Sequence, residues 1–496
     1  MLAVLAVIYV LNFVDRQLLT ILAPNLKRDL EISDSEFGFL YGTAFGVFYA
    51  LFGIPLGKLA DRWNRVQLLA LGLGLWSAMT ALSGLARNFG EVALARIGVG
   101  IGEASANPSA YSLIADSFPA HQRATALGIY SSGLYLGGGI SLFVGSSVAA
   151  GWNALFADGP APLGLAGWQA AFLAVGLPGV LLAIYVATLR EPPRGRFDMG
   201  IAQSLASGAP WATIWADLVD VLPPFTLLGA ARRGPRALAV NLAIAGGIGL
   251  SAWGLISWLG DPAQWIAFGL GCYAVASWAL ALRASDGPTF GSLWQSPAFM
   301  GITLAYALIS FIGYAATAFT PLFAIQSLGA DPQVAGWMLG SIGAVAGMAG
   351  VIGGGLLADR LARSGRDSLR IVLMAASAVG MMICQGLIFS ATSLGTFYAV
   401  VPFGWLCTSA CLGSASGLIV NLVVPPLRGT ATAAFLLGTN LIGLALGPYA
   451  AGKLSDGFGN LGQGMLAMLA VSPAILGCLL LAYLAQRRRE ANPGTR

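Results

Sequence analysis

Long apolar runs dominate the amino-acid sequence and limit the folds that it can adopt. Only 9% of the 496 residues are charged and 57% are hydrophobic, whereas a soluble domain carries about 25% charged residues. A run of about 20 apolar residues is long enough to cross a bilayer as an α-helix. In lipid, helices satisfy the backbone polar groups within the segment itself. The sequence therefore predicts an all-α polytopic membrane protein.

The predicted spans form two sets of six, with an extra pair between them. The first set is predicted at about 3–23, 36–57, 67–86, 91–114, 122–150 and 169–189. The second set is predicted at about 297–323, 333–358, 370–390, 394–422, 429–452 and 462–485. The extra pair, about 237–259 and 263–282, is divided by Gly260-Asp261-Pro262, which indicates a turn. We therefore predict two six-helix bundles, twelve core helices in all, plus an inserted transmembrane hairpin.

Polar segments set the predicted domain boundaries. The N-terminal bundle would occupy 1–189, a cytoplasmic linker with the hairpin 190–295, the C-terminal bundle 296–486 and a basic cytoplasmic tail 487–496. In the linker, the apolar residues of 209–222 fall on one face, which predicts an amphipathic helix at the membrane surface.

The basic residues predict the orientation. Most of the 26 Lys and Arg residues fall in loops on one side of the membrane, and Lys27, Arg28, Arg87 and Lys453 fall on the other. Cytoplasmic loops are enriched in Lys and Arg. We therefore predict a multi-pass protein of the cell (inner or plasma) membrane with both termini in the cytoplasm. The net charge of +5 reflects these loops, and no nucleic-acid partner is expected.

An internal repeat supports the two predicted bundles. Leu59-Ala60-Asp61-Arg62, after the second span, recurs as Leu357-Ala358-Asp359-Arg360 after the equivalent span of the second set. Arg123-Ala124-Thr125-Ala126 is similarly echoed by Arg428-Gly429-Thr430-Ala431. Parallel duplication of a six-helix unit is a known transporter architecture.

Charged residues inside the predicted spans mark a candidate site. Arg96, Gly100, Glu103 and Asn107 are spaced to lie on one face of a single helix. Gly98, Gly100 and Gly102 would let a neighbouring helix approach closely. Charged groups at this depth are costly and mark functional sites. The alternative interpretation is a structural ion pair within the bundle.

The first span carries a second polar group, Asn12, Asp15 and Arg16. Asp15 and Glu103 are both expected near the middle of the membrane. Neutralisation of Asp15 by its neighbour Arg16 is an alternative to a functional role, and for Asn12 a hydrogen bond between helices is the favoured interpretation.

The motifs resemble the major facilitator superfamily. Gly57-Lys58-Leu59-Ala60-Asp61-Arg62-Trp63-Asn64-Arg65 is similar to its loop motif between helices 2 and 3, with Asn64 in place of the usual second glycine. Asn12-Phe13-Val14-Asp15-Arg16 resembles the Spinster-like branch, as does Gly102-Glu103-Ala104-Ser105 with Pro108, Tyr111 and Asp116. Eukaryotic Spinster-like members are associated with export of lysolipids and sphingosine-1-phosphate. The short loops and the Ala- and Gly-rich spans indicate a bacterial member.

This resemblance implies a secondary transporter that works by alternating access. Burial disfavours an ionised carboxyl group, and a nearby guanidinium favours it. A conformational change that opens or closes a contact with Arg96 could therefore load and release a proton on Asp15 or Glu103. We expect proton coupling, with Asn12, Arg16 and Asn107 at the same site.

The second set of spans carries hydroxyls and amides in place of charges. Candidate cavity-lining residues are Tyr306, Tyr314, Thr320 and Asn440. A cavity that is charged on one wall and apolar on the other suits an amphipathic or lipid-like organic anion. The alternative is a small sugar acid or another organic anion. The predicted partners are this small substrate, protons and the lipid bilayer, and the protein is predicted to be a monomer.

The loop motifs are candidates for a cytoplasmic gate. The residues are Asp61, Arg62, Arg65, Arg123, Asp359, Arg360 and Arg428. The resemblance implies that Asp61 and Asp359 each lie near the N-terminal end of a helix of the opposite half, where the helix dipole stabilises a carboxylate. Alternatively, these charges only enforce the topology.

Few residues are available for metal or catalytic chemistry. The chain has one histidine, His121, and its five cysteines lie in apolar runs. A metal site or a His-dependent triad is therefore not expected, and neither is a cofactor. A membrane enzyme acting on lipid headgroups and a non-transporting sensor are the less favoured alternatives.

Overall fold

The computed structural model describes residues 1–496 except 195–218, 220–221, 363–367, 424–426 and 492–496. Every secondary-structure element in the described ranges is a helix. Of these helices, 13 are long and apolar enough to cross a membrane. The predicted all-α membrane fold is confirmed. The predicted surface helix at 209–222 lies almost entirely outside the described residues.

The chain folds into two compact units. Unit 1 comprises Met1–Ile32 and Thr43–Trp278, and unit 2 comprises Ser33–Gly42 and Ala279–Arg496. The second predicted span is therefore shared, because it starts in unit 2 and continues in unit 1. The predicted domain boundaries did not include this sharing.

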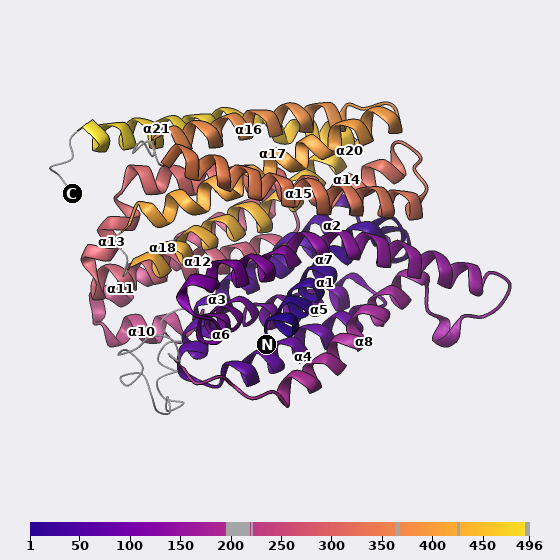
Figure 1. The fold of residues 1–496 in the computed structure, drawn as a ribbon, viewed down its shortest axis with the longest axis horizontal. Coiled ribbons are helices and arrows are strands. Elements are labelled where there is room, and N and C mark those ends of the chain that lie inside the picture. The colour runs from indigo at the N-terminus through magenta and orange to yellow at the C-terminus, as the bar shows by residue number, and fades with distance from the viewer. Residues whose placement is uncertain (195–218, 220–221, 363–367, 424–426, 492–496) are drawn as a thin grey trace. The chain divides into compact units, whose positions relative to one another are not determined.

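Unit 1 contains the first set of spans, except the start of the second span, and most of the hairpin (Figure 1). Helix α1 packs against α7, and α4 packs against α5 and α8. The helices are α1 (Leu2–Leu30), α3 (Ala44–Arg62), α4 (Arg65–Ser83), α5 (Phe89–Glu103), α6 (Ala106–Ser117), α7 (Ala120–Leu155), α8 (Gly167–Ala187), α10 (Thr226–Arg232), α11 (Pro235–Leu259) and α12 (Pro262–Ser285).

Unit 2 has its core between α14, α16, α17 and α21, which pack through Ile, Leu, Met, Phe and Ala side chains. Its elements are α2 (Asp34–Gly38), the π-helix η1 (Phe39–Thr43), α13 (Gly287–Trp294), α14 (Pro297–Gln326), α15 (Pro332–Ala362), α16 (Ser368–Phe389), α17 (Leu394–Asn421), α18 (Arg428–Gly438), the π-helix η4 (Thr439–Leu446), α19 (Gly447–Phe458), α20 (Leu461–Ala467) and α21 (Ser472–Ala491). Thr43, the last residue of η1, belongs to unit 1.

The fourth predicted span is not one continuous helix, and the prediction of an unbroken helix over 91–114 was wrong. Helix α5 ends at Glu103 and α6 begins at Ala106. Pro108 explains the break, because proline lacks the N–H that would bond the carbonyl of Ala104, and its ring clashes with that carbonyl. Ser105 covers the break by donating a hydrogen bond to the carbonyl of Gly102, at 2.8 Å. Glu103 and Asn107 therefore lie on two different helices.

Glycines allow the helices of unit 1 to approach closely, as predicted for this region. A Cβ atom added to Gly100 would lie 2.5 Å from the carbonyl oxygen of Phe45 in α3. One added to Gly102 would lie 2.8 Å from the carbonyl oxygen of Gly72 in α4. Both distances are too short for a side chain. Helix α5 is thus held against the backbones of α3 and α4, with Glu103 at its end.

Within unit 2, the start of the second span packs against α19. Asp456 accepts hydrogen bonds from the first two backbone N–H groups of α2, each at 2.9 Å. A Cβ atom at Gly38 would overlap the backbone of Pro448, and one at Gly452 would overlap the backbone of Asp34. From Asp34 to Gly38 the contacts move four residues forward along the second span, while from Gly452 to Pro448 they move four residues backward along α19. The two helices are therefore antiparallel and in backbone contact.

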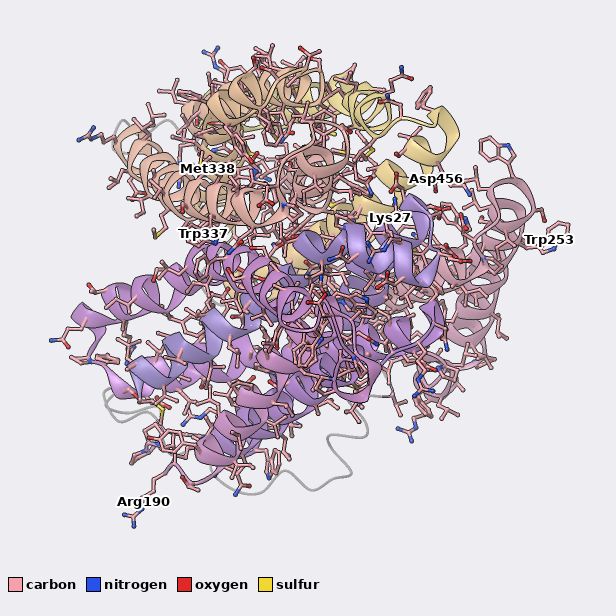
Figure 2. The ribbon with its side chains drawn as sticks, turned by 90° about the vertical axis from the view of Figure 1, so that its right-hand side faces the viewer. Lys27, Arg190, Trp253, Trp337, Met338 and Asp456 are labelled. Carbon is pink, nitrogen blue, oxygen red and sulfur yellow. The ribbon has the colours of Figure 1, made fainter. Side chains whose placement is uncertain are left out.

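The inserted hairpin consists of α11 and α12, and both are candidate membrane spans. Helix α11 is mostly exposed, with Trp253 at 69% and Trp258 at 80%. Figure 2 shows Trp253 directed outward from the hairpin. An apolar, exposed helix of this length is suited to contact with lipid.

Candidate functional site

Helix α1 places three polar residues of the candidate site in a buried position. Asn12, Asp15 and Arg16 are each less than a tenth exposed. The helix is built from Leu, Ile, Val and Ala around them and contains no proline before Pro24. Because residues four apart share a helix face, Asn12 and Arg16 point to the same side. The Asn12 side chain lies beside Glu103.

Arg16 and Glu103 form a buried ion pair. Nη2 of Arg16 donates a hydrogen bond to Oε2 of Glu103 at 2.6 Å, with the two side chains 9% and 0% exposed. The hydrogen bond is charge-assisted, which is the stronger class. Arg16 thus pairs with Glu103, and the alternative in which Arg16 neutralises Asp15 is wrong.

Aromatic rings surround the guanidinium of Arg16. Its Cζ atom lies 4.4 Å from the ring centre of Phe45, 4.7 Å from Phe13 and 5.2 Å from Tyr49. These distances are those of cation–π contacts. We call Phe13, Phe45 and Tyr49 the Arg16 cage. The available sequence signal for this cage was aromatic residues spaced by four, Tyr9 to Phe13 and Phe45 to Tyr49, which were not among the predicted site residues.

Asp15 is fully buried, and neither of its carboxylate oxygens makes a hydrogen bond with a described residue. The hydroxyl of Thr80 and the indole N–H of Trp76 lie near it, but neither reaches ordinary hydrogen-bond geometry. A buried polar group without a hydrogen bond is unfavourable. Asp15 is therefore the least satisfied acidic group of the site.

Arg96 contributes the second positive charge. Its side chain is 1% exposed, and its Cζ atom lies 5.3 Å from the ring centre of Phe45. It is within electrostatic range of both Asp15 and Glu103. The structure therefore brings two carboxyl groups and two guanidinium groups together in unit 1, so that their formal charges balance.

Asn107 joins two tyrosines from other helices. The Tyr130 hydroxyl donates to Oδ1 of Asn107 at 3.0 Å, and Nδ2 of Asn107 donates to the Tyr49 hydroxyl at 3.2 Å. The Tyr130 ring stacks on Tyr9 with centres 4.2 Å apart, and its edge meets Tyr111 at 5.7 Å. The result is a continuous surface of rings and hydroxyls next to the Arg16 cage.

The geometry allows Arg16 to exchange Glu103 for another anion. Glu103 occupies the guanidinium through one oxygen only, and its other oxygen has no hydrogen bond in the described parts of the chain. A proton on Glu103 would remove the negative charge from this pair. A carboxylate or phosphate from outside could then take its place, because guanidinium groups bind such anions in a fixed geometry.

The predicted cavity residues of the second set lie in unit 2. Tyr306 is buried and stacks on Phe435, with ring centres 5.1 Å apart. Thr320 is buried and donates to the carbonyl of Ala316 in its own helix, at 2.6 Å. Tyr314 is half-buried, and Asn440 lies buried in the π-helix η4.

Arg65 is the most strongly bonded of the predicted gate residues. It is 1% exposed, donates to Asp116 through a short hydrogen bond, and donates to Glu191 at 2.6 Å and to the Ser112 hydroxyl at 2.8 Å. Because Glu191 follows α8, Arg65 ties the end of that helix to α4 and α6. Glu191 and Ser112 were not among the site residues predicted from the sequence.

Arg194 caps the end of α3. Its guanidinium donates to the backbone carbonyls of Ala60, Asp61 and Trp63, which are otherwise left without helical partners. Burial first, and then the positive charge of Arg65, lower the pKa of Arg194 from its ordinary value.

The remaining gate residues whose side chains are described are more exposed than Arg65. Asp61, Arg62, Asp359 and Arg360 are exposed, and Arg123 donates to the carbonyl of Phe118 at 3.1 Å. Arg428 begins α18, and its side chain is outside the described set.

In the described residues, no group of three or more His, Cys, Asp or Glu side chains could hold a metal ion. The five cysteines are free thiols. The site therefore consists of ion pairs, rings and hydroxyls.

A bundle of membrane-spanning helices with charged side chains buried inside it is the arrangement of a membrane transporter. The sequence model of the Major Facilitator Superfamily matches residues 5–321. The chain belongs to the major facilitator superfamily. Its members are transporters and not enzymes, and they carry small substrates across a membrane.

Three relatives illustrate the similarity. An MFS-type efflux pump of Mycolicibacterium smegmatis is 28% identical over 506 residues, covering 98% of this chain and 92% of its own. Protein spinster homolog 1 of Xenopus tropicalis is 25% identical over 474 residues, covering 91% of this chain and 72% of its own. A probable L-galactonate transporter of Escherichia coli is 30% identical over 175 residues, which is 35% of each chain.

A solved structure agrees with this assignment. The inward-facing, unoccupied structure of a bacterial homolog to the human lysosomal transporter Spinster has a TM-score of 0.71 and 25% identity, covering 98% of this chain and 96% of its own. The chain is thus a Spinster-like member of the superfamily, as the motifs of α1, α5 and α6 had predicted.

Proposed function

We propose that the protein is a proton-coupled secondary transporter that works by alternating access and carries an amphipathic organic anion. The observation that carries the proposal is the buried Arg16–Glu103 ion pair, with Asp15 beside it and without a hydrogen bond in the described structure. Arg16 is thus a binding group for an anion, and Glu103 and Asp15 are two acids that can take up a proton.

Proton and anion binding are linked through Arg16. Glu103 and an anionic substrate group compete for the same guanidinium. Protonation of Glu103 removes the competitor and favours the anion, and by reciprocity the bound anion favours protonation of Glu103. Asp15, which is close to Arg96, is the second proton-binding group. In this scheme the proton on Glu103 and the anionic group on Arg16 bind in the same state.

The rings next to Arg16 support an amphipathic substrate. The Arg16 cage offers apolar surface directly around the guanidinium, and the stacked Tyr9 and Tyr130 extend this surface. A lysolipid combines an anionic headgroup with an apolar chain and could use both. Tyr306, Tyr314, Thr320 and Asn440 are proposed as further substrate contacts within unit 2.

Uptake into proteoliposomes tests this proposal. We expect a pH gradient to drive accumulation of lysophosphatidylglycerol by the wild-type protein. Glu103→Gln and Asp15→Asn should each abolish the response to the gradient, and Arg28→Met, an exposed change on the same helix, should not. Full coupling in both acidic-site variants would refute the mechanism.

A small sugar acid is the second candidate substrate. The similarity to the probable L-galactonate transporter favours it, and so do the amide and hydroxyls of Asn107, Tyr49 and Tyr130, which suit a polyhydroxylated molecule. Thermal-shift measurements in detergent that compare L-galactonate with lysophosphatidylglycerol would decide between the two. If L-galactonate stabilises the protein and lysophosphatidylglycerol does not, the sugar acid is the substrate and the proposal of an amphipathic substrate is refuted.

We also propose that both termini face the cytoplasm, that the hairpin is inserted between two six-helix bundles, and that the protein works as a monomer in the cell membrane. The distribution of Lys and Arg supports the orientation. In it, Asp61, Arg62, Arg65, Arg123, Asp359, Arg360 and Arg428 lie at the cytoplasmic ends of the spans as gate residues. Labelling of single-cysteine variants from either side of the membrane tests it.

A further inference from the structure

We propose that the inserted hairpin positions the Arg16 cage through Gln264, which holds the π-helix of the second span. This inference rests on the proposed function, because it concerns the same site. It assigns a role to the hairpin.

The contact joins the first turn of α12 to η1. The hydroxyl of Thr43 donates to Oε1 of Gln264 at 2.6 Å, and both residues are at most 1% exposed. An amide buried in a membrane segment is unfavourable unless it is hydrogen bonded, and hydrogen bonds between helices stabilise their packing. Gln264 is thus a specific polar contact in a hairpin whose other surfaces are largely apolar.

The contact lies at a special point of the second span. Residues Phe39–Thr43 form a π-helix between α2 and α3. A π-turn holds one more residue than an α-turn, and such turns are frequent at functional sites. The border between the two compact units falls between Gly42 and Thr43, the end of the same π-helix. This is the joint at which the span passes from one unit to the other.

The π-helix determines where the Arg16 cage lies. Phe45 follows Thr43 by two residues and Tyr49 by six, on the same continuous helix. Conversion of the π-turn to an α-turn would shift the register of the residues that follow by one, which is a turn of about 100° about the helix axis. Such a rotation would remove both rings from Arg16 and break the hydrogen bond from Asn107 to Tyr49.

The hydrogen bond between Thr43 and Gln264 therefore favours the π-helical form, in which Phe45 and Tyr49 contact the guanidinium of Arg16. The nitrogen of the same side-chain amide, Nε2, is buried and has no acceptor in the described residues.

Hydrogen–deuterium exchange of residues 37–50 in the purified full-length protein tests the inference without any substrate. Gln264→Leu and Thr43→Val should each raise exchange in this segment about fivefold, the factor that corresponds to the net contribution of one buried hydrogen bond. Thr43→Ser keeps the hydroxyl and should behave as wild type. Tyr273→Phe is the matched control, because it removes a buried hydrogen bond that Tyr273 of the same hairpin accepts from Thr226 of α10.

Transport of lysophosphatidylglycerol is the second measurement. Gln264→Leu should change turnover by a similar factor, and the double variant with Thr43→Val should change it no further than either single variant. Unchanged exchange at 37–50 in Gln264→Leu, or an equal rise in Tyr273→Phe, would overturn the inference. If the wild-type protein transports no lysolipid, the proposed substrate fails, while the exchange result still decides the role of Gln264.

Discussion

Removal of Arg16 tests the buried ion pair most directly. Arg16→Met keeps the length and apolar volume of the side chain but leaves Glu103 buried without its partner. At the observed 2.6 Å and an effective dielectric constant of about 20, the attraction between the two charges is about 6 kcal/mol. Desolvation of both groups offsets much of it. Breaking one side of such a pair costs about 3–5 kcal/mol.

A second substitution, at Glu103, separates the energy of the ion pair from the effects of packing. In the double variant Arg16→Met/Glu103→Gln the uncompensated carboxylate is absent, so we expect most of the lost stability to return. The coupling energy of the double-mutant cycle should then exceed about 2 kcal/mol, well above the usual error of additivity. Arg28→Met is the control, because the Arg28–Asp29 pair on the same helix is exposed at 72% and 28% and should contribute less than about 1 kcal/mol.

The assay is reversible unfolding of the purified protein in mixed micelles with increasing sodium dodecyl sulfate, which reports the free energy of unfolding. A coupling energy near zero, with additive losses, would refute the argument that Arg16 and Glu103 stabilise each other. So would an equal loss in Arg28→Met.

Three further outcomes are expected. Asp15→Asn should leave the free energy of unfolding within about 1 kcal/mol or raise it, because no hydrogen bond is lost, while proton-driven uptake disappears; a large loss of stability would show that Asp15 is a structural group. Arg65→Lys should cost about 2–4 kcal/mol, because lysine cannot supply the several directed hydrogen bonds of the guanidinium, whereas Arg62→Lys at an exposed position should change unfolding by less than about 0.5 kcal/mol; equal effects would contradict the bonding of Arg65. Asp456→Ala removes the acceptor of two N–H groups at the start of α2; it should cost about 1 kcal/mol, as the loss of a capping side chain does, and raise hydrogen exchange at the first turn of α2. Unchanged exchange there would show that Asp456 contributes nothing to that turn.

The positions of the membrane helices could be predicted because they depend on local composition. A run of apolar residues crosses the membrane wherever it lies in the fold. The hairpin at α11 and α12 appeared as apolar runs divided by Gly260 and Pro262. The break in the fourth span was also local, since Pro108 was visible in the sequence, but the predicted span was extended across it on hydropathy alone.

The candidate site was only partly predictable. Asp15, Arg16, Arg96 and Glu103 are conspicuous because charges are rare in apolar spans. Their pairing is not encoded in spacing, because it depends on how α1, α3 and α5 lie next to one another. The alternative in which Arg16 neutralises its neighbour Asp15 was wrong for this reason, since adjacent residues point to different sides of a helix.

The aromatic residues of the site were missed because they are common in membrane helices. Nothing in composition distinguishes Tyr49 or Tyr130 from a ring that merely packs. The hydrogen bonds to Asn107, which lie across three helices, separate them from packing residues. That distinction depends on the tertiary structure.

The sequence by itself determined the membrane class, the duplicated loop motifs and the set of buried charges, because each follows from residue type and local order. Only the tertiary structure decided that Arg16 pairs with Glu103, that Asp15 is left without a hydrogen bond in the described chain, and that Gln264 meets Thr43 at a π-helix. These are contacts between residues far apart in sequence. Their geometry depends on the packing of backbones at glycines such as Gly100 and Gly102, and no single segment specifies it.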